Sequence, residues 1–280
     1  MATASLTIRE WRNSFVRINR IPLEVLSLIA THLESQSDRL QATFVCRHWR
    51  RTFLQYPALW SWLYLEKGEA YVKTVLERAK GSTLDIVSFQ STPVGVITLL
   101  PPHIKQIRSL HFSWQSWADI RRFSELNSGP LPLLRTLKIE YIEDISPYAM
   151  IPSSLLFSNA VDLREFKLSS RYSPFLNSFV FPNLTSFELS VERVEGFQAS
   201  QLLDFLEASP MLRKVQMKII ADISFDDVPR ERAVVLPNVK SLSLVVSDGG
   251  PGYDLVTRIS CPSVKKAILA YEKDIEDTTL

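Results

Sequence analysis

The stretch Phe181-Pro182-Asn183-Leu184-Thr185-Ser186-Phe187-Glu188-Leu189 contains the unit from which most of this chain is built. Leu184, Phe187 and Leu189 follow the order apolar-x-x-apolar-x-apolar. The last three positions alternate apolar, polar and apolar residues, as a β-strand with one buried face does. The unit therefore predicts a strand that packs against a core on one side only.

The same pattern occurs seven times between residues 107 and 269. Its first apolar positions are residues 107, 134, 163, 184, 212, 239 and 264, so successive copies lie 21 to 29 residues apart. A proline stands two residues before five of the copies, where it can open a strand without interrupting it. These prolines are Pro132, Pro182, Pro210, Pro237 and Pro262. The chain thus contains internal repeats, with a period in the leucine-rich-repeat range of about 20 to 29 residues.

The segments between the copies predict crossover connections. Residues 201–208, for example, space Leu202, Phe205 and Leu206 as a short packed helix does. A strand, a crossover and a further strand give a parallel sheet. Strands of a doubly wound sheet are buried on both faces and read as continuous apolar runs, whereas these strands alternate. We therefore expect a parallel sheet with one open face.

The open face is mostly polar, and only the last copy places an apolar residue, Ile268, at the central position. Stacked repeats leave such an inner surface free for binding. Because its charges are mixed, we hypothesise that it binds a protein target, although each residue taken singly fits a solvated strand position equally well. The central candidates are His111, Lys138, Lys167, Glu188, Gln216 and Ser243. Flanking candidates are Thr136, Glu140, Glu165, Ser186, Ser190, Lys214 and Lys218.

The repeats resemble divergent leucine-rich repeats over residues 84 to about 271. The resemblance implies a curved solenoid, but the usual Asn or Cys of the repeat consensus is missing. Ahead of the repeats, residues 69–80 read as a connector helix with Gly81 at its C-terminal cap.

Two further helical patterns precede the connector. The first begins at Pro22, and its apolar residues spread over an arc of roughly 220°, about twice the stripe of a one-sided helix. The second follows the capping residues Ser37 and Asp38 and runs on until Pro57 stops it. Helices this short cannot enclose so much apolar surface unaided. Either the rest of the chain or a partner protein must cover it.

On physical grounds neither covering is favoured, and a family resemblance decides for a partner. Ile21-Pro22-Leu23-Glu24-Val25-Leu26, Val45-Cys46-Arg47-His48-Trp49-Arg50 and Leu59-Trp60 together resemble the F-box over residues 20 to about 62, although Ile21 stands where Leu is usual. The resemblance implies binding to a Skp-family adaptor and, through it, to cullin and RING subunits. The positions that match adaptor-contacting or supporting ones are Pro22, Leu23, Ile29, Leu40, Val45, Cys46 and Trp49. Leu26 and Leu33 fit internal packing equally well.

Composition narrows the alternatives. The 280 residues carry 32 basic and 30 acidic side chains, and the formal net charge of +2 predicts no binding to nucleic acid or to a membrane. Two distant cysteines, Cys46 and Cys261, predict a reducing compartment, so we expect a cytoplasmic or nuclear protein. Residues 1–20 resemble an organelle transit peptide, but Trp11 and Phe15 are spaced to pack on one helical turn.

Catalytic and metal-binding patterns are not apparent. Cys46 and His48 have no second pair of ligands at zinc spacing, and residues 247–252 lack the Gly-Lys-Ser/Thr ending of a phosphate-binding loop. Asp226 and Asp227 have no positioned base beside them. We therefore expect no metal, no cofactor and no enzymatic activity, and keep an unrecognised enzyme as the remote alternative.

These observations give one interpretation. The fold class is α/β, with an N-terminal F-box three-helix domain followed by a leucine-rich-repeat-like solenoid with a curved parallel sheet. The expected segments are an extension (1–19), the F-box (20–62), a connector helix (63–83), the repeats (84–271) and a tail (272–280). The resemblance implies the substrate-recognition subunit of a Skp-cullin-F-box ubiquitin ligase. The alternative is an F-box scaffold that acts outside any ligase.

Overall fold

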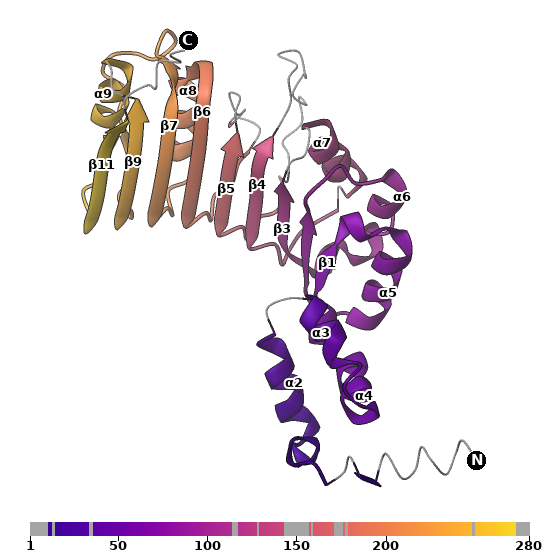
Figure 1. Ribbon diagram of the computed structural model, residues 1–280. Coiled ribbons are helices and arrows are strands. Elements are labelled where there is room, and N and C mark those ends of the chain that lie inside the picture. The colour runs from indigo at the N-terminus through magenta and orange to yellow at the C-terminus, as the bar shows by residue number, and fades with distance from the viewer. Residues whose placement is uncertain are drawn as a thin grey trace, which may run out of the picture.

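The computed structural model describes residues 11–12, 15–33, 36–113, 117–127, 129–142, 157, 159–170, 176, 179–247 and 250–272. Within these residues, nine strands form one parallel sheet in the order β1-β2-β3-β4-β5-β6-β7-β9-β11 (Figure 1). The strands therefore follow one another across the sheet in the same order as along the chain, as strands of stacked repeats do. The predicted parallel sheet is confirmed.

Each of the seven copies of the repeat pattern forms a strand of this sheet. The sequence therefore predicted these strands from local spacing alone. They are β3 (Ile107–Ser113), β4 (Thr136–Ile142), β5 (Glu165–Ser170), β6 (Ser186–Gln198), β7 (Lys214–Ser224), β9 (Ser241–Ser247) and β11 (Lys266–Glu272).

The sheet begins earlier than residue 84, where the sequence placed its start. Strand β1 (Trp62–Tyr64) pairs with β2 (Leu84–Ser88), so the segment assigned to the connector adds a strand. All five residues of β2 are buried. The helix predicted over residues 69–80 is α5 (Glu69–Ala79), and Gly81 beyond it has the positive φ of 84° that glycine tolerates best.

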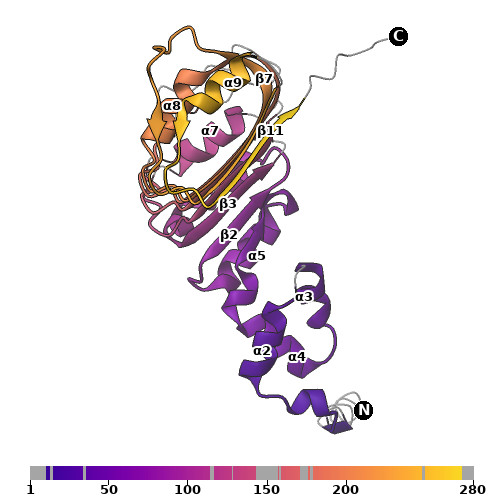
Figure 2. The same cartoon turned by 90° about the vertical axis from the view of Figure 1, so that its left-hand side faces the viewer.

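Helices cover one face of the sheet. Figure 2 shows α7 (Trp117–Leu126), α8 (Ala199–Glu207) and α9 (Gly250–Thr257) on the same side of the sheet. The shorter elements are α6 (Val94–Ile97), η3 (Leu65–Lys67), η4 (Pro101–Gln106), β8 (Val234–Val235) and β10 (Ile259–Ser260). The face opposite the helices is called the bare face below.

The core lies between the sheet and these helices. Burial alternates along the strands, as in β9, whose buried residues begin at Leu242 and follow at every second position. The rings of Phe166 and Phe187 lie 5.9 Å apart, and Phe205 of α8 lies 4.6 Å from Phe187. All three side chains are fully buried. Each contributes about 1.5–3 kcal/mol by leaving water.

The last strand departs from this pattern. Ala267 and Leu269 occupy core positions of the seventh copy, yet both are exposed, Leu269 by 51%. Strand β11 is at the edge of the sheet and pairs only with β9. The apolar pattern therefore predicted the strand but not its burial, because burial needs a neighbouring layer.

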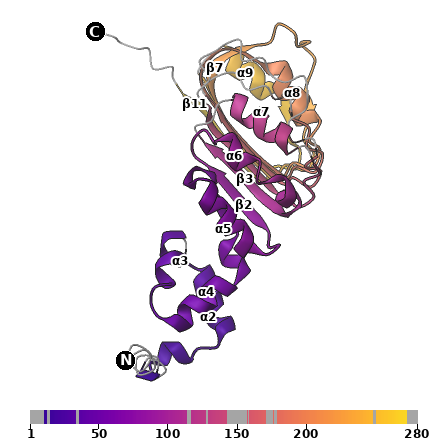
Figure 3. The same cartoon turned by 90° about the vertical axis from the view of Figure 1, so that its right-hand side faces the viewer.

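The N-terminal helices project from the β1 end of the sheet (Figures 1 and 3). They are η1 (Arg17–Arg20), α2 (Leu23–Thr31), α3 (Gln36–Ala42) and α4 (Arg47–Gln55). The second helical pattern of the sequence is thus two helices rather than one. Thr43 ends α3 because its Oγ1 donates to the Leu40 carbonyl oxygen over 2.7 Å, a local bond that competes with the helix.

A short 3-10 helix, η2 (Pro57–Trp60), joins the helices to the sheet. Trp60 is buried, and its Nε1 donates to the carbonyl oxygen of Phe53 in α4 over 3.1 Å. The guanidinium of Arg78 in α5 lies over the Trp60 ring, 4.4 Å from its centroid. Trp60 therefore ties the N-terminal helices to the first layer of the sheet domain.

Candidate functional site

Helix α2 buries one narrow side and exposes the rest. Pro22 stands at the N-cap, one residue before the position that the sequence suggested, and Glu24 in the first turn suits the positive end of the helix dipole. Leu26 and Ala30 are fully buried, so of the two interpretations left open for Leu26 the structure supports internal packing. The other apolar residues of the helix remain in solvent. They are Leu23, Val25, Leu28 and Ile29, with exposed fractions of 40%, 45%, 59% and 40%.

The turn between α3 and α4 adds to this surface. Its backbone is closed by a hydrogen bond from Phe44 N to Gln41 O, of 2.9 Å, and one from Val45 N to Ala42 O, of 3.3 Å. The Phe44 side chain is 75% exposed and that of Val45 61%. No described part of the chain covers these side chains. The structure thus leaves uncovered the apolar surface that the sequence assigned either to the rest of the chain or to a partner.

These exposed side chains are called the apolar surface below. Scattered exposed apolar residues are ordinary, but several on neighbouring elements mark an interaction site. The apolar surface consists of Leu23, Val25, Leu28, Ile29, Leu40, Phe44 and Val45.

Cys46 and Trp49 occupy a different place from the other predicted adaptor-contacting residues. Both are half-buried. The Trp49 ring stacks on Phe53 with centroids 5.6 Å apart, and its Nε1 donates to Asn19 Oδ1 over 3.0 Å. The same oxygen lies 3.7 Å from Cys46 Sγ. Asn19 therefore holds the start of α4 against the segment before α2, so these two residues support the surface.

The structure exposes five of the predicted adaptor-contacting residues, namely Pro22, Leu23, Ile29, Leu40 and Val45. Sequence reasoning did not assign Val25, Leu28 and Phe44 to this group, although the wide apolar arc of α2 was a signal for the first two. For Phe44, helical spacing suggested packing, and the break in the helix turns it outward. Trp11 and Phe15 contact each other edge to face at 4.8 Å, and both remain more than half exposed.

The arrangement of helices, exposed apolar residues and supporting tryptophan can be compared with known families. Residues 18–66 match the F-box-like family. The F-box-like domain is thus close to the predicted bounds of 20–62, and it contains every predicted adaptor-contacting residue. F-box domains generally bind Skp adaptors. No curated protein matches the chain, and the leucine-rich-repeat class of the sheet domain stays a prediction.

The bare face aligns the predicted target-binding residues in one row. In the strand register, His111 lies beside Lys138, Lys138 beside Lys167, and Lys167 beside Glu188. Glu188 is followed by Gln216 and Ser243 on the next two strands. The sequence predicted this alignment, because equivalent positions of stacked repeats fall side by side. Whether these residues bind a target stays a hypothesis.

Glu140 connects three strands of this face. Its Oε2 lies 2.7 Å from His111 Nε2, and its Oε1 lies 2.8 Å from Lys167 Nζ. Lys167 Nζ is also 3.0 Å from Glu188 Oε1. Burial raises the pKa of Glu140, but the hydrogen bonds from Lys167 and His111 outweigh it, and the net pKa lies below its ordinary value. The hydrogen bond to Glu140 raises the pKa of Lys167.

An aromatic edge borders this charged group. The rings of Phe89 and His111 meet edge to face at 5.7 Å, and Tyr64 of β1 lies 6.5 Å from Phe89. Phe89 is 41% exposed. The first strands of the bare face therefore offer an apolar and aromatic contact beside a network of mixed charge. Such a combination suits a polypeptide ligand, since aromatic residues are enriched at protein interfaces.

Among the described residues, no three His, Cys, Asp or Glu side chains lie where they could hold a metal ion. In the same part of the chain, no helix is long and apolar enough to cross a membrane. Residues 250–252, part of the segment compared above with a phosphate-binding loop, begin α9. The two surfaces described above therefore carry the functional argument.

Proposed function

We propose that this protein is the substrate-recognition subunit of a Skp-cullin-F-box ubiquitin ligase. The apolar surface of the F-box-like domain would bind the Skp adaptor, and the bare face of the sheet would hold a target protein. The observation that carries the proposal is the exposure of Leu23, Leu28 and Val45 within the segment that matches the F-box-like family.

The mechanism we propose is proximity, without chemistry by this chain. The adaptor links the F-box-like domain to the cullin and RING subunits, and the sheet domain brings a target to the same assembly. Transfer of ubiquitin to target lysines then becomes an intramolecular encounter, whose effective concentration reaches the millimolar range for short linkages. In this proposal the protein needs no cofactor and works in the cytoplasm or nucleus, where such ligases act.

The tight connection between the two domains supports this arrangement. Trp60 contacts both α4, through its hydrogen bond to Phe53, and α5, through Arg78. A fixed connection would hold a bound target at a constant position relative to the ligase. A flexible tether would instead spread the target over many positions and lower its effective concentration.

A titration of the purified Skp adaptor tests the first step. The wild-type chain is compared with Pro22→Ala/Leu23→Ala, and circular dichroism establishes that both are folded. Tight binding by the wild type that is lost in the folded variant would support the proposal. If the wild type does not bind, the F-box-like domain has another partner.

Purification from cells then separates a ligase subunit from a scaffold. A ligase subunit brings cullin and RING proteins with the adaptor, and this recovery depends on Leu23. If the adaptor alone is recovered, the scaffold outside a ligase becomes the better interpretation.

A further inference from the structure

A ladder of basic residues runs along the amino ends of the strands. From β4 onward, the residue just before each strand of the large sheet donates its backbone N–H to the carbonyl oxygen of the equivalent residue one repeat earlier. Examples are Arg135 to Arg108 over 2.8 Å and Lys240 to Arg213 over 2.8 Å. Equivalent positions therefore stack directly on one another. The ladder comprises the basic residues Arg108, Arg135, Arg164, Arg213, Lys240 and Lys265, with the uncharged Thr185 at the equivalent position between Arg164 and Arg213.

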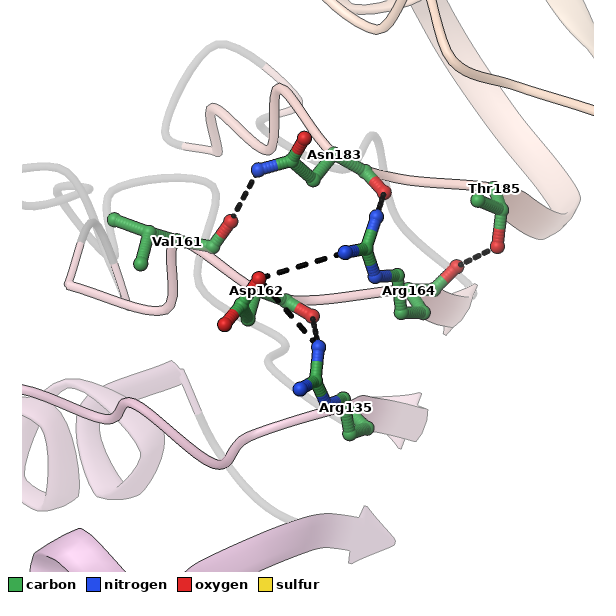
Figure 4. Close-up of polar contacts among 6 residues, drawn as sticks. All are labelled: Arg135, Val161, Asp162, Arg164, Asn183 and Thr185. Carbon is green, nitrogen blue, oxygen red and sulfur yellow. Dashed lines mark hydrogen bonds and ion pairs between the residues drawn. The ribbon is translucent and has the colours of Figure 1, made fainter.

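The first half of the ladder is partly neutralised by two aspartates, since three arginines pair with Asp85 and Asp162. Arg108 forms an ion pair with the buried Asp85. Arg135 and Arg164 both reach Asp162, each with a nitrogen 3.5 Å from its Oδ1 (Figure 4). Arg164 also donates to the Asn183 carbonyl oxygen over 3.1 Å. These three arginines thus serve as internal braces between repeats.

The second half of the ladder is not neutralised. Arg213, Lys240 and Lys265 are exposed, and no side chain among the described residues pairs with them. Lys214 directly follows Arg213 in the sequence, and Lys266 directly follows Lys265. The strand register places Ser241 between Lys214 and Lys266 on the bare face. Both are exposed and likewise have no acidic partner within the described part of the chain. The basic patch is defined as Arg213, Lys214, Lys240, Lys265 and Lys266.

The basic patch differs from two other cations of the bare face, Lys167 and Lys218, which have acidic neighbours. Lys167 is shared by Glu140 and Glu188, and Lys218 lies 3.2 Å from Glu192 and 3.4 Å from Glu272. The cations of the patch start three adjacent strands about 4.8 Å apart, so they repel one another in the free protein. A ligand with clustered negative charge would relieve this repulsion.

We infer that the basic patch binds a short acidic segment of the target protein, with carboxylate or phosphoryl groups on alternate residues. The patch spans three strands, or about 10 Å, which is the length of about three residues of extended chain. Exposed apolar residues stand next to it in the sequence. Met211 lies two residues before Arg213 and Val264 one residue before Lys265, with exposed fractions of 46% and 36%. Apolar and cationic groups together match an acidic peptide with apolar neighbours.

A nucleic acid fits this surface less well. Its phosphates would continue past the patch, and the register places Glu165 of β5 one strand beyond Ser186, the neighbour of Lys214. Glu188 and Glu140 lie further along the same face. The formal net charge of +2 also gives no long-range attraction for a polyanion.

The position of the patch suits the proposed function, on which this inference rests. In Figure 1, β7, β9 and β11 begin at the lower edge of the sheet, the side on which α2, α3 and α4 lie, but at the opposite end. A target bound there would be held at the same edge of the sheet as the F-box-like domain that would bind the ligase.

Fluorescence anisotropy with a short labelled peptide of alternating Glu and Val tests the inference. Its matched probes carry phosphoserine or Gln in place of Glu. We expect the Glu and phosphoserine peptides to bind, the Gln peptide not to bind, and binding to fall as salt shortens the screening length. Lys240→Glu/Lys265→Glu should weaken binding at least about tenfold, since each reversal replaces attraction by repulsion. Lys240→Gln/Lys265→Gln should give a smaller loss.

The matched control is Lys67→Glu/Lys105→Glu, which changes the net charge equally with exposed lysines at the other end of the sheet. It should leave peptide binding within about twofold. Equal binding of the Gln peptide, or an equal loss in the control, would overturn the inference. Tighter, patch-dependent binding of a single-stranded oligonucleotide would show that the occupant is a nucleic acid instead.

An adaptor titration on the same samples separates the two proposals. Adaptor binding without binding of either acidic peptide refutes the basic patch alone. Peptide binding without adaptor binding refutes the ligase role and leaves the patch as an independent site.

Discussion

The F-box-like domain and the sheet domain treat apolar residues in opposite ways. In the sheet domain, Phe166 and Phe187 of the strands are fully buried against Phe205 of α8. In the N-terminal helices, Leu28 and Phe44 are more than half exposed. The first region is stable because its own layers enclose its apolar surface, whereas the second keeps that surface for another molecule. Substitutions of apolar residues should therefore affect stability in one region and association in the other.

The largest effect is expected in the core of the sheet domain. Phe187→Ala removes a ring that contacts Phe166 and Phe205, and it should lower the free energy of unfolding by about 3–5 kcal/mol. Urea unfolding followed by circular dichroism measures this loss. Phe187→Leu, which keeps most of the volume, should cost clearly less. Equal losses for both variants would contradict a packed aromatic cluster.

A smaller effect, of another kind, is expected at the apolar surface. Leu28→Ala/Phe44→Ser should leave the free energy of unfolding nearly unchanged, because both side chains are already in solvent. The same change should weaken adaptor binding by about 2 kcal/mol, as truncated interface anchors do. Isothermal titration calorimetry measures the affinity. Leu26→Ala is the matched control, since it should destabilise the buried side of α2. The contrast between the two regions would fail if Leu28→Ala/Phe44→Ser unfolded the domain.

The hydrogen bond between Asn19 and Trp49, which supports the apolar surface, should contribute less to the free energy of unfolding. Asn19→Ala removes the acceptor for Trp49 Nε1, and we expect a loss of about 1 kcal/mol in the free energy of unfolding. Asn19→Asp keeps an acceptor oxygen and should retain most of the stability. Differential scanning calorimetry compares the three proteins. Similar losses for Ala and Asp would mean that packing, rather than the hydrogen bond, holds Trp49.

The smallest effect is expected on the bare face. Glu140→Gln removes the charge shared by His111 and Lys167 and should cost below about 1 kcal/mol at neutral pH. Because the net pKa of Glu140 is lowered in the fold, its contribution is present above the ordinary value of about 4.3 and disappears as the pH falls through the lowered value.

Urea unfolding of both proteins at about pH 7 and about pH 3 tests this dependence. The difference between wild type and Glu140→Gln should be larger at the higher pH than at the lower. The raised pKa of Lys167 keeps that lysine charged throughout this range, so it does not add to the change. A difference of equal size at both pH values would contradict a contribution from the charge of Glu140.

Much of the fold followed from local patterns. The spacing of Leu184, Phe187 and Leu189, repeated along the chain, predicted seven strands and their order, because each repeat can bury its apolar face only against its neighbours. The alignment of His111 with Lys138 and Lys167 followed from the same periodicity. Strand β1 was not predicted, since three residues are too few to show a period.

The residues of the candidate site could be predicted only in part from local sequence patterns. Pro22, Leu23 and Trp49 came from family resemblance, and the wide apolar arc of α2 showed that something must cover it. Helical spacing cannot tell the buried Leu26 from the exposed Leu28, because both are apolar and the neighbouring helix determines the difference. Phe44 was assigned to a helix that the Thr43 hydrogen bond ends.

Periodicity alone determined the strands, their parallel order and the polarity of the bare face, since each depends on residues close together in the chain. The assembled fold determined which apolar residues stay exposed and which cations stay unpaired. Arg135 and Arg213 occupy equivalent positions, but only Arg135 meets an aspartate, Asp162, among the described residues. Neutralisation and burial depend on neighbours from distant segments, and those neighbours are defined only when the repeats stack.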